Sequence, residues 1–345
     1  MKAIYLNKHG SLDEVRYGEA PEPEPRENEV LIEVLAAGLN HLDLWVCREP
    51  GDMGMEMPHI IGSDAAGVVL ENRSSNAELT QGREVILYPG LSCGRCRFCR
   101  RNQESLCDKL GIIGVARPGT FAEQIAVPAA NVFPKPDHLS LEEAGVFSIP
   151  FLTAWRMIQT KADIVKGETV LVHGIGGGVA QAALAILKSM DVQVIATSSS
   201  NDKLSIARRH GADHTVNYTE FNDLGKVVLD ITDGRGVDAV IDSVGAATLP
   251  AGIKGLRKGG RLVICGVTSG AQAMLDIQCL YWNQLSVMGS TLGSLAEYIE
   301  LLREAESRRL RPVIDSAYTL EQARDALERL QQGDQYGNIV LKNQK

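Results

Sequence analysis

The segment His173-Gly174-Ile175-Gly176-Gly177-Gly178-Val179-Ala180 follows an apolar strand pattern and leads into a helical one. A dinucleotide's pyrophosphate needs close backbone and free N–H groups at a helix N-terminus, where side chains would obstruct it. Gly174 and Gly177 allow such a turn, while Gly178 and the small Ala180 permit close packing of the helix on the strand. A purely structural turn is the alternative, but the strand–turn–helix context favours dinucleotide binding, with Val179 at the start of the helix.

Apolar strands and helical patterns alternate on both sides of this turn. Strands are predicted at 169–173, 192–196, 237–241 and 261–265, and helices at 179–189 and about 202–210. Continuous apolar strands that alternate with helices indicate a parallel sheet covered on both faces. We therefore predict an α/β fold whose doubly wound parallel-sheet (Rossmann) domain occupies residues 150–291.

The sequence on either side of residues 150–291 shows a different pattern of predicted strands and helices. Residues 1–149 contain short strand patterns, such as 30–34, 66–69 and 84–87, bounded by Gly, Pro and Asn, which is typical of a β-rich domain. Residues 292–345 carry two amphipathic helical patterns, near 294–306 and 320–332, and a final strand at 337–341. This last segment is too short for a core of its own, so we expect it to pack back onto residues 1–149.

Composition excludes several classes of function. The 345 residues carry a formal net charge of −8, which argues against nucleic acid and against an anionic membrane surface as partners. The N-terminal residues lack the apolar block of a signal peptide, and no apolar run is long enough to span a bilayer. We expect a cytoplasmic protein that acts on a small-molecule substrate.

Four cysteines are clustered between residues 93 and 107, namely Cys93, Cys96, Cys99 and Cys107. Two-residue gaps let consecutive cysteines point at one ion, and four thiolates with no open position describe a structural zinc site. An iron–sulfur cluster is the competing ligand, and free thiols without a metal are a further alternative. We predict one structural Zn²⁺ per chain.

The residues after the second strand bear on cofactor choice. An NAD-binding site usually ends this strand with an acid, which binds the ribose 2′-hydroxyl and repels a 2′-phosphate. Here Thr197 takes that place, and Ser198, Ser199 and Lys203 suit a phosphate, so NADP(H) is favoured over NAD(H). The alternative is a polar loop that only caps the next helix through Ser200 or Asn201.

The order of these features resembles the medium-chain dehydrogenase/reductase superfamily, in the branch of zinc-containing alcohol dehydrogenase-like proteins and NADPH:quinone oxidoreductases. The supporting segments are 37–43, 62–69, 152–155 and the glycine turn. The resemblance implies a GroES-like catalytic domain at 1–149 with a zinc lobe at 93–107, and a C-terminal return at 292–345. It also implies cofactor contacts from Thr153 and Gly266, and a homodimer or homotetramer paired through the edge strand near 285–289.

The departures from the family pattern concern the catalytic metal. Zinc-dependent members bind this ion through a Cys, a His and a second Cys, which correspond here to Asn40, Ser63 and either Ser148 or Ile149. Trp45 stands at the position of the proton relay. Asp43 and Asp64 match acids that support the metal ligands, and we interpret them as hydrogen-bonding struts in a site without its ion.

This pattern predicts hydride transfer to a quinone, enone or related carbonyl, because a conjugated acceptor delocalises its developing charge. Asn40 is the expected donor to the substrate carbonyl, with His41 as a possible proton source. Segment 51–57 lacks the Tyr of some enoyl reductases, and its methionines suggest a broad apolar substrate. The alternatives are an alcohol or aldehyde oxidoreductase that uses protein donors in place of zinc, and a non-catalytic NADPH-binding protein.

Overall fold

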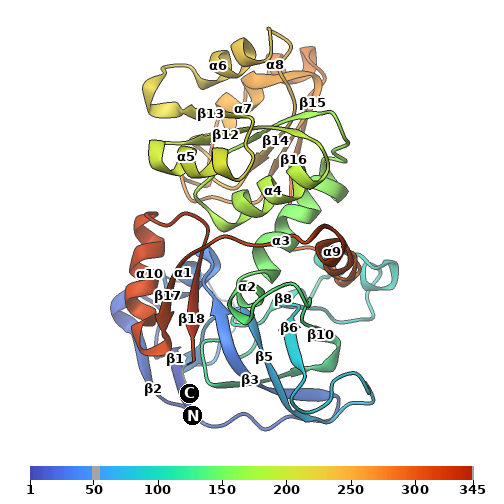
Figure 1. Ribbon diagram of the computed structural model, residues 1–345, viewed down its shortest axis with the longest axis vertical. Helices are drawn as coiled ribbons and strands as arrows, with labels where there is room; N and C mark the ends of the chain where they lie inside the picture. Colours follow the sequence, from blue (N-terminus) through green and yellow to red (C-terminus); the bar gives the residue numbers. More distant parts are fainter. Residues whose placement is uncertain (49–54, 344–345) are drawn as a thin grey trace. The chain divides into compact units, whose positions relative to one another are not determined.

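The computed structural model describes residues 1–48 and 55–343, and the chain divides into two units (Figure 1). The β-rich unit comprises Met1–Ile149 and Gly293–Lys345, and the Rossmann unit comprises Pro150–Leu292. The chain passes from the first unit to the second within α3 (Ser148–Trp155), which continues into the π-helical turn Arg156–Lys161.

The Rossmann unit contains a six-stranded sheet in the order β13-β12-β11-β14-β15-β16, with every pair parallel. Its strands are β11 (Thr169–Val172), β12 (Gln193–Ser198), β13 (His214–Asn217), β14 (Val237–Asp242), β15 (Leu256–Ile264) and β16 (Ser286–Gly289). Numbered within the unit this order is 3-2-1-4-5-6, the arrangement of dinucleotide-binding domains. The predicted doubly wound sheet is confirmed.

Helices cover both faces of this sheet, with α4 and α5 on one side and α6 and α7 on the other (Figure 1). The helices are α4 (Gly178–Ser189), α5 (Asn201–Arg209), α6 (Leu224–Ile231), α7 (Leu249–Gly255) and α8 (Ile277–Trp282), with a 3-10 turn at Tyr218–Glu220. Every residue of β11 and β14 is buried. This double covering explains why these strands are apolar without alternation.

The β-rich unit is built on a sheet in the order β10-β6-β5-β3-β18-β17, with β9 also paired to β3. A second sheet has the order β2-β1-β4, and β7 pairs with β8. The strands are β1 (Lys2–Leu6), β2 (Val15–Glu19), β3 (Glu29–Gly38), β4 (His59–Ile60), β5 (Asp64–Asn72), β6 (Glu84–Leu87), β7 (Gly90–Leu91), β8 (Gly111–Ile112), β9 (Gln124–Pro128), β10 (Val132–Pro134), β17 (Ile314–Thr319) and β18 (Asn338–Lys342). The C-terminal segment therefore lies inside this sheet, because β18 pairs with β3 as well as with β17.

Local capping fixes where the helices of this unit begin and end. They are α1 (His41–Arg48), α2 (Leu141–Gly145), α9 (Leu295–Arg308) and α10 (Ala323–Gln332), with 3-10 turns at Leu12–Glu14, Cys99–Arg101, Glu104–Leu106, Ala129–Asn131 and Leu320–Gln322. Ser294 and Glu297 form a capping box that starts α9, because each side chain accepts the other's backbone N–H. Gly333, with φ 72°, ends α10 in the left-handed conformation that glycine adopts readily.

The core of the β-rich unit lies between its sheets and α10, and it includes Phe121, Ile32, Leu79 and Leu327. Gly62 packs against this core at φ 96°, where a Cβ atom would lie 2.2 Å from the Phe121 ring. This close approach fixes the backbone directly before Ser63 and Asp64. Among the described residues, no helix is long and apolar enough to cross a bilayer.

Candidate functional site

A buried polar cluster joins β3, α1 and β5 in the β-rich unit. The strand pairing sets Gly38 opposite Asp64, so Asn40, two residues after β3, lies beside the start of β5. The Asn40 backbone N–H donates to Asp43 Oδ2 at 2.7 Å, and Asn40 Nδ2 donates to Asp64 Oδ2 at 3.0 Å. All three side chains are buried. The predicted site residues Asn40, Asp43 and Asp64 therefore form one hydrogen-bonded group.

Asp64 also binds the third segment of the predicted site. Its Oδ1 atom accepts the backbone N–H of Ile149 at 2.9 Å, so one carboxyl group connects Asn40 with Ile149. The Ser148 hydroxyl lies 2.7 Å from Tyr298 Oη on α9, which donates to the Leu87 carbonyl. These contacts place amide, hydroxyl and backbone groups at the positions corresponding to metal-binding cysteines.

Ser63 completes this set of positions. Its hydroxyl is buried and has no hydrogen-bond partner within the described part of the chain. Apart from the four clustered cysteines, the described residues contain no group of three or more His, Cys, Asp or Glu side chains that converges as metal ligands would. The residues at this site do not fit a zinc ion, because Asn40, Ser63 and Ser148 or Ile149 offer no Cys, His, Asp or Glu ligand, and the two acids alone are too few to hold one.

Burial disfavours the ionised forms of both acids in the cluster. It raises the pKa of Asp43 to about 8, with the neighbouring Asp64 adding to the shift and the Asn40 backbone N–H opposing it. Burial likewise raises the pKa of Asp64 to about 7, against the hydrogen bonds from the Asn40 side chain and the Ile149 N–H. The cluster therefore changes charge near neutral pH.

Three other features predicted for the site, His41, Trp45 and segment 51–57, are not part of this hydrogen-bonded group. His41, the first residue of α1, is exposed, and so is Trp45 on the same helix. Of the methionine-containing segment 51–57, residues 51–54 lie outside the described residues. Met55 and Met57 are half-buried and pack against the core. These two side chains therefore contribute to the core of the unit.

The four clustered cysteines converge as a metal site would. Their sulfur atoms all lie within 4.8 Å of one another, with Cys96 and Cys99 separated by 3.5 Å and Cys93 and Cys99 by 3.9 Å. Zinc–sulfur bonds of about 2.3 Å in a tetrahedron place sulfurs slightly under about 4 Å apart. A multi-iron cluster would hold its thiolates farther apart, because they bind different irons. The geometry fits a single zinc ion.

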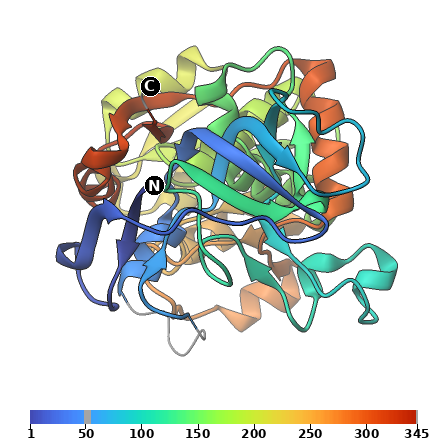
Figure 2. The ribbon, with the colours of Figure 1, turned by 90° about the horizontal axis from the view of Figure 1, so that it is seen from below.

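The lobe that holds these cysteines extends from the side of the β-rich unit (Figure 2). Two 3-10 turns, Cys99–Arg101 and Glu104–Leu106, form most of it. The backbone N–H groups of Cys93 and Lys109 donate to Cys107 Sγ. The N–H of Cys99 is the main cause that lowers the pKa of Cys96 to about 6. Such donors favour the thiolate form that binds metal.

The glycine turn of the Rossmann unit has the form that a pyrophosphate requires. Gly177 is the N-cap of α4 and provides no side-chain cap, so no N-cap side chain takes up the first N–H groups of the helix, which begins with Gly178 and Val179. At Gly174, with φ 69°, a Cβ atom would lie 2.6 Å from Val244 Cγ2. At Gly266, a Cβ atom would lie 2.0 Å from the Ser243 carbonyl oxygen. These residues fit a dinucleotide cofactor.

The loop after β12 corrects one prediction. Thr197 is fully buried, and its hydroxyl lies 3.0 Å from His173 Nδ1, so it cannot stand where a ribose-binding acid would. Ser198 ends the strand, and its hydroxyl accepts the Ser200 N–H at 3.1 Å. The position that faces a ribose is therefore better assigned to Ser198. The prediction placed the ribose-facing position at Thr197, one residue too early. Because consecutive residues of a strand face opposite sides of the sheet, this error of one residue selected the wrong side.

The remaining residues of this loop are compatible both with NADP(H) binding and with a loop that only caps the next helix. Ser200 caps α5 by accepting the Lys203 backbone N–H, as the capping alternative supposed. Ser199 is exposed, and Lys203 is half-buried in the first turn of α5. Thr153, expected to contact the cofactor, is buried in α3.

Two functional features escaped sequence analysis. The buried Asp242 at the end of β14 accepts the N–H groups of Val244 and Gly245 and the Thr248 hydroxyl, at 2.7 to 3.0 Å. It thereby orders the loop that packs against Gly174. The strand-terminal Asp242 followed by Gly245 was the available signal. No signal in the sequence marked the Ile149 backbone N–H, because only the fold brings it to Asp64.

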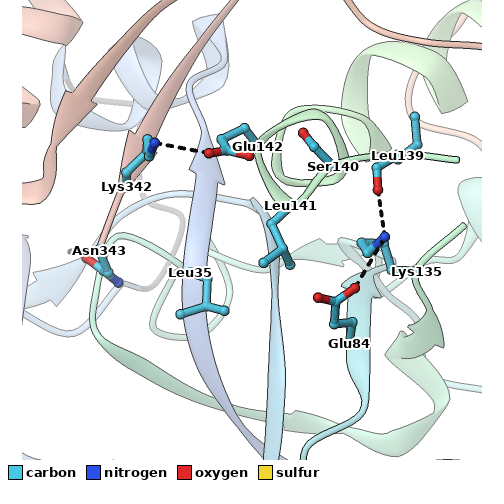
Figure 3. A pocket seen from close by; sticks show the side chains of 9 residues that line it. All are labelled: Leu35, Glu84, Lys135, Leu139, Ser140, Leu141, Glu142, Lys342 and Asn343. Carbon is cyan, nitrogen blue, oxygen red and sulfur yellow. Dashed lines mark hydrogen bonds and ion pairs between the residues drawn. The ribbon is translucent and has the colours of Figure 1, made fainter. Parts of the chain in front are cut away.

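A separate hollow of about 490 Å³ opens on the β-rich unit and is shown in Figure 3. Two ion pairs line it, Lys135–Glu84 at 3.3 Å and Lys342–Glu142 at 3.0 Å. Each cation is paired with an acid, and Lys135 also donates to the Leu139 carbonyl. None of the predicted site residues lines it, so it is not the candidate active site.

Two family models match the chain. Residues 26–137 match the alcohol dehydrogenase GroES-like domain, and residues 178–307 match the zinc-binding dehydrogenase family. The GroES-like part of the fold prediction is thereby confirmed.

Individual proteins resemble the chain along most of its length. An alcohol dehydrogenase of Geobacillus stearothermophilus is 30% identical over 99% of both chains. A crotonyl-CoA carboxylase/reductase of Cereibacter sphaeroides is 28% identical over 92% of this chain and 80% of its own. A crystal structure described as an NAD-dependent alcohol dehydrogenase superimposes with a TM-score of 0.95, at 38% identity and full coverage of both chains.

Proposed function

The chain belongs to the medium-chain dehydrogenase/reductase superfamily as an alcohol dehydrogenase-like oxidoreductase, and from this premise we propose that it reduces a quinone, enone or related conjugated carbonyl with NAD(P)H and without a catalytic zinc ion. The observation that carries the proposal is the Asp64 carboxyl group, which holds Asn40 and Ile149 together where zinc-dependent relatives have metal ligands.

The donor set at this cluster determines which substrates suit it. A simple alcohol or ketone requires stabilisation of an alkoxide, which zinc commonly supplies as a Lewis acid. Here the available donors are neutral, the Asn40 amide foremost. A conjugated acceptor needs less help, because its charge spreads over several atoms. A bound nicotinamide would supply the hydride, and the Asn40 side-chain amide would donate to the carbonyl oxygen as charge develops on it.

The relatives support two versions of this chemistry. The crotonyl-CoA carboxylase/reductase is a relative whose name includes reduction of a conjugated thioester, which favours the conjugated acceptor. The relatives named alcohol dehydrogenases favour the second candidate, an alcohol or aldehyde oxidoreductase that relies on protein donors. A non-catalytic NADPH-binding protein is the third candidate, and it would consume no cofactor.

Two bound groups and an assembly belong to the proposal. The four cysteines bind one structural Zn²⁺, and the Ser198–Lys203 loop favours NADP(H) over NAD(H), although similar proteins carry names with NAD. We also propose a homodimer or homotetramer that acts in the cytoplasm.

The deciding experiment measures NADPH and NADH consumption by the purified protein with a panel of quinones, enones, aldehydes and ketones. We expect turnover with conjugated acceptors at least about tenfold above that with simple aldehydes, and no increase on addition of Zn²⁺. Asn40→Leu should lower kcat by about tenfold to a thousandfold, as does loss of an oxyanion donor. Asn76→Leu, at an exposed loop residue, is the matched control.

Three results would contradict the proposal. Higher turnover with simple aldehydes would favour the second candidate. Absence of turnover with the whole panel, with NADPH binding intact, would favour the third. A zinc-dependent rate would show that the cluster binds a catalytic ion after all.

A further inference from the structure

The cluster contains two buried acids without a balancing cation. Asp43 and Asp64 are each about 1% exposed, and no ion pair joins either of them to a residue in the described ranges 1–48 and 55–343. Two buried carboxylates near one another cannot both ionise without a large cost. At least one of them therefore holds a proton over part of the neutral range.

The Asn40 side chain is hydrogen-bonded to Asp64. Asn40 Nδ2 donates to Asp64 Oδ2, and within the described residues no hydrogen bond reaches Asn40 Oδ1. The Asn40 backbone is fixed, because its N–H donates to Asp43 and its carbonyl accepts the Asp43 N–H at 2.9 Å. A half-turn of the terminal amide would exchange Nδ2 and Oδ1 and leave the backbone unmoved.

Hydrogen-bond chemistry links the two groups. An ionised carboxylate only accepts, so it must face the amide N–H₂ end, as the observed contact does. A protonated carboxyl donates one O–H, and it can then face the amide oxygen. Asp64 Oδ1 stays occupied by the Ile149 N–H in both cases, so Oδ2 is the atom that changes its role.

We propose that protonation of Asp64 turns the Asn40 amide, so that its N–H groups face the substrate when Asp64 is protonated and its oxygen faces the substrate when Asp64 is ionised. This inference rests on the proposed function, in which Asn40 binds the substrate oxygen. The protonated form donates to a carbonyl and therefore supports reduction. The ionised form accepts from a hydroxyl and supports the reverse oxidation. Asp64 is thus a positioning residue that acts through Asn40.

The other titratable groups around Asp64 do not account for such a switch. Burial raises the pKa of Cys47 to about 12 and raises that of Tyr298 well above its ordinary value, so both stay neutral. Burial and the Asp64 carboxylate raise the pKa of Asp43 to about 8, and burial and Arg48 lower the pKa of His41. The experiment must therefore separate Asp64 from Asp43 and His41.

The test is the pH profile of kcat/KM for reduction of the best conjugated acceptor. In the unmodified protein we expect a fall of about tenfold per pH unit above about pH 7. In Asp64→Asn the new amide can accept from Ile149 and donate to Asn40 Oδ1, as a protonated Asp64 would. This variant should lose the fall and exceed the unmodified protein at alkaline pH.

Two further variants serve as controls. Asp43→Asn should leave the fall in place, because Asp43, with a pKa of about 8, still holds its proton while Asp64 titrates near 7, and His41→Asn should leave it in place as well. A fall that persists in Asp64→Asn, or that disappears in His41→Asn, would overturn the inference.

A second measurement does not depend on activity or on Asp64→Asn folding. The side-chain amide resonances of Asn40, assigned in ¹⁵N-labelled protein with the help of Asn40→Ala, should move with pH with a midpoint near that of the profile. Asp43→Asn should leave this midpoint in place. Amide resonances that do not respond to pH would reject the switch. Failure of the whole acceptor panel would instead reject the proposed function and leave the amide titration as an independent result.

Discussion

At the scale of single residues, the buried acids predict an unusual pH dependence of stability. The pKa of Asp43 is about 8 and that of Asp64 about 7 in the folded protein, against 3.8 for an unperturbed Asp. Because the folded state holds these protons more tightly, stability is greatest below about pH 4 as far as this pair is concerned. It falls as pH rises towards about 8 and is then constant.

The variant Asp43→Asn removes one of these groups and should reduce this loss. Each pKa unit corresponds to about 1.4 kcal/mol. The free energy of unfolding of Asp43→Asn, relative to that of the unmodified protein, should therefore rise by several times this amount between about pH 5 and about pH 8.5. Urea unfolding at a series of pH values measures this, with the exposed Asp163→Asn as control. Parallel curves for Asp43→Asn and the unmodified protein would show that Asp43 is ionised already at low pH.

The loop after β12 gives the second prediction at this scale. A charge-assisted contact with a 2′-phosphate is worth about 1.5–3 kcal/mol, or one to two decades in affinity. NADPH should therefore bind at least about several-fold tighter than NADH, and Lys203→Ala should remove most of the difference. Fluorescence titration with both cofactors tests this, with Lys258→Ala as control. Equal affinities would mean that the loop only caps α5.

Sequence analysis identified Asn40, Asp43 and Asp64 as site residues, because they stand where the family pattern places a metal and its supports. It could not identify the Ile149 backbone N–H, since any residue type has one. It also misplaced the ribose position by one residue, at Thr197. A strand's phase is set by pairing with distant segments, and a one-residue error exchanges the two faces.

At the scale of elements, we expect the cysteine lobe to depend on a bound zinc ion. Its 3-10 turns are three residues long and contribute little stability alone. Cys96→Ser should lower the zinc content from one ion per chain towards zero and make residues 93–107 sensitive to protease. Elemental analysis and limited proteolysis measure this, with Cys279→Ser as control. Iron, two zinc ions per chain, or full zinc retention in Cys96→Ser would contradict the assignment.

Elements with local signals were the predictable ones. The helix starts at Ser140 and Ser294 each show a Ser followed three residues later by Glu, and α9 begins within one residue of its predicted start. The two-residue strands β4, β7 and β8 carry no such signal. They exist because a distant segment pairs with them, which a local pattern does not contain.

At the scale of the whole molecule, β16 is an edge strand of the Rossmann sheet, with exposed apolar residues just before it in the chain. Met274 is 91% exposed, Ile277 70% and Trp282 69%. Such an edge beside apolar surface favours pairing with a second copy. Light scattering at micromolar concentration should show a dimer or tetramer, which Ile277→Lys should dissociate. The exposed Val165→Lys is the matched control, and a monomeric unmodified protein would contradict the prediction.

The position of β18 in the sheet has a consequence for biosynthesis. Its partner β3 ends about 300 residues earlier in the chain, and ribosomes add about 5–20 residues per second. Residues 36–38 of β3, which pair with β18, therefore lack this neighbour for about 15–60 s, while residues 150–292, which are contiguous, can already fold. The nascent chain is most exposed to aggregation during this interval, and chaperone capture should be concentrated there. A chain that ends just before Asn338 would never form β18, so it would stay exposed to aggregation permanently.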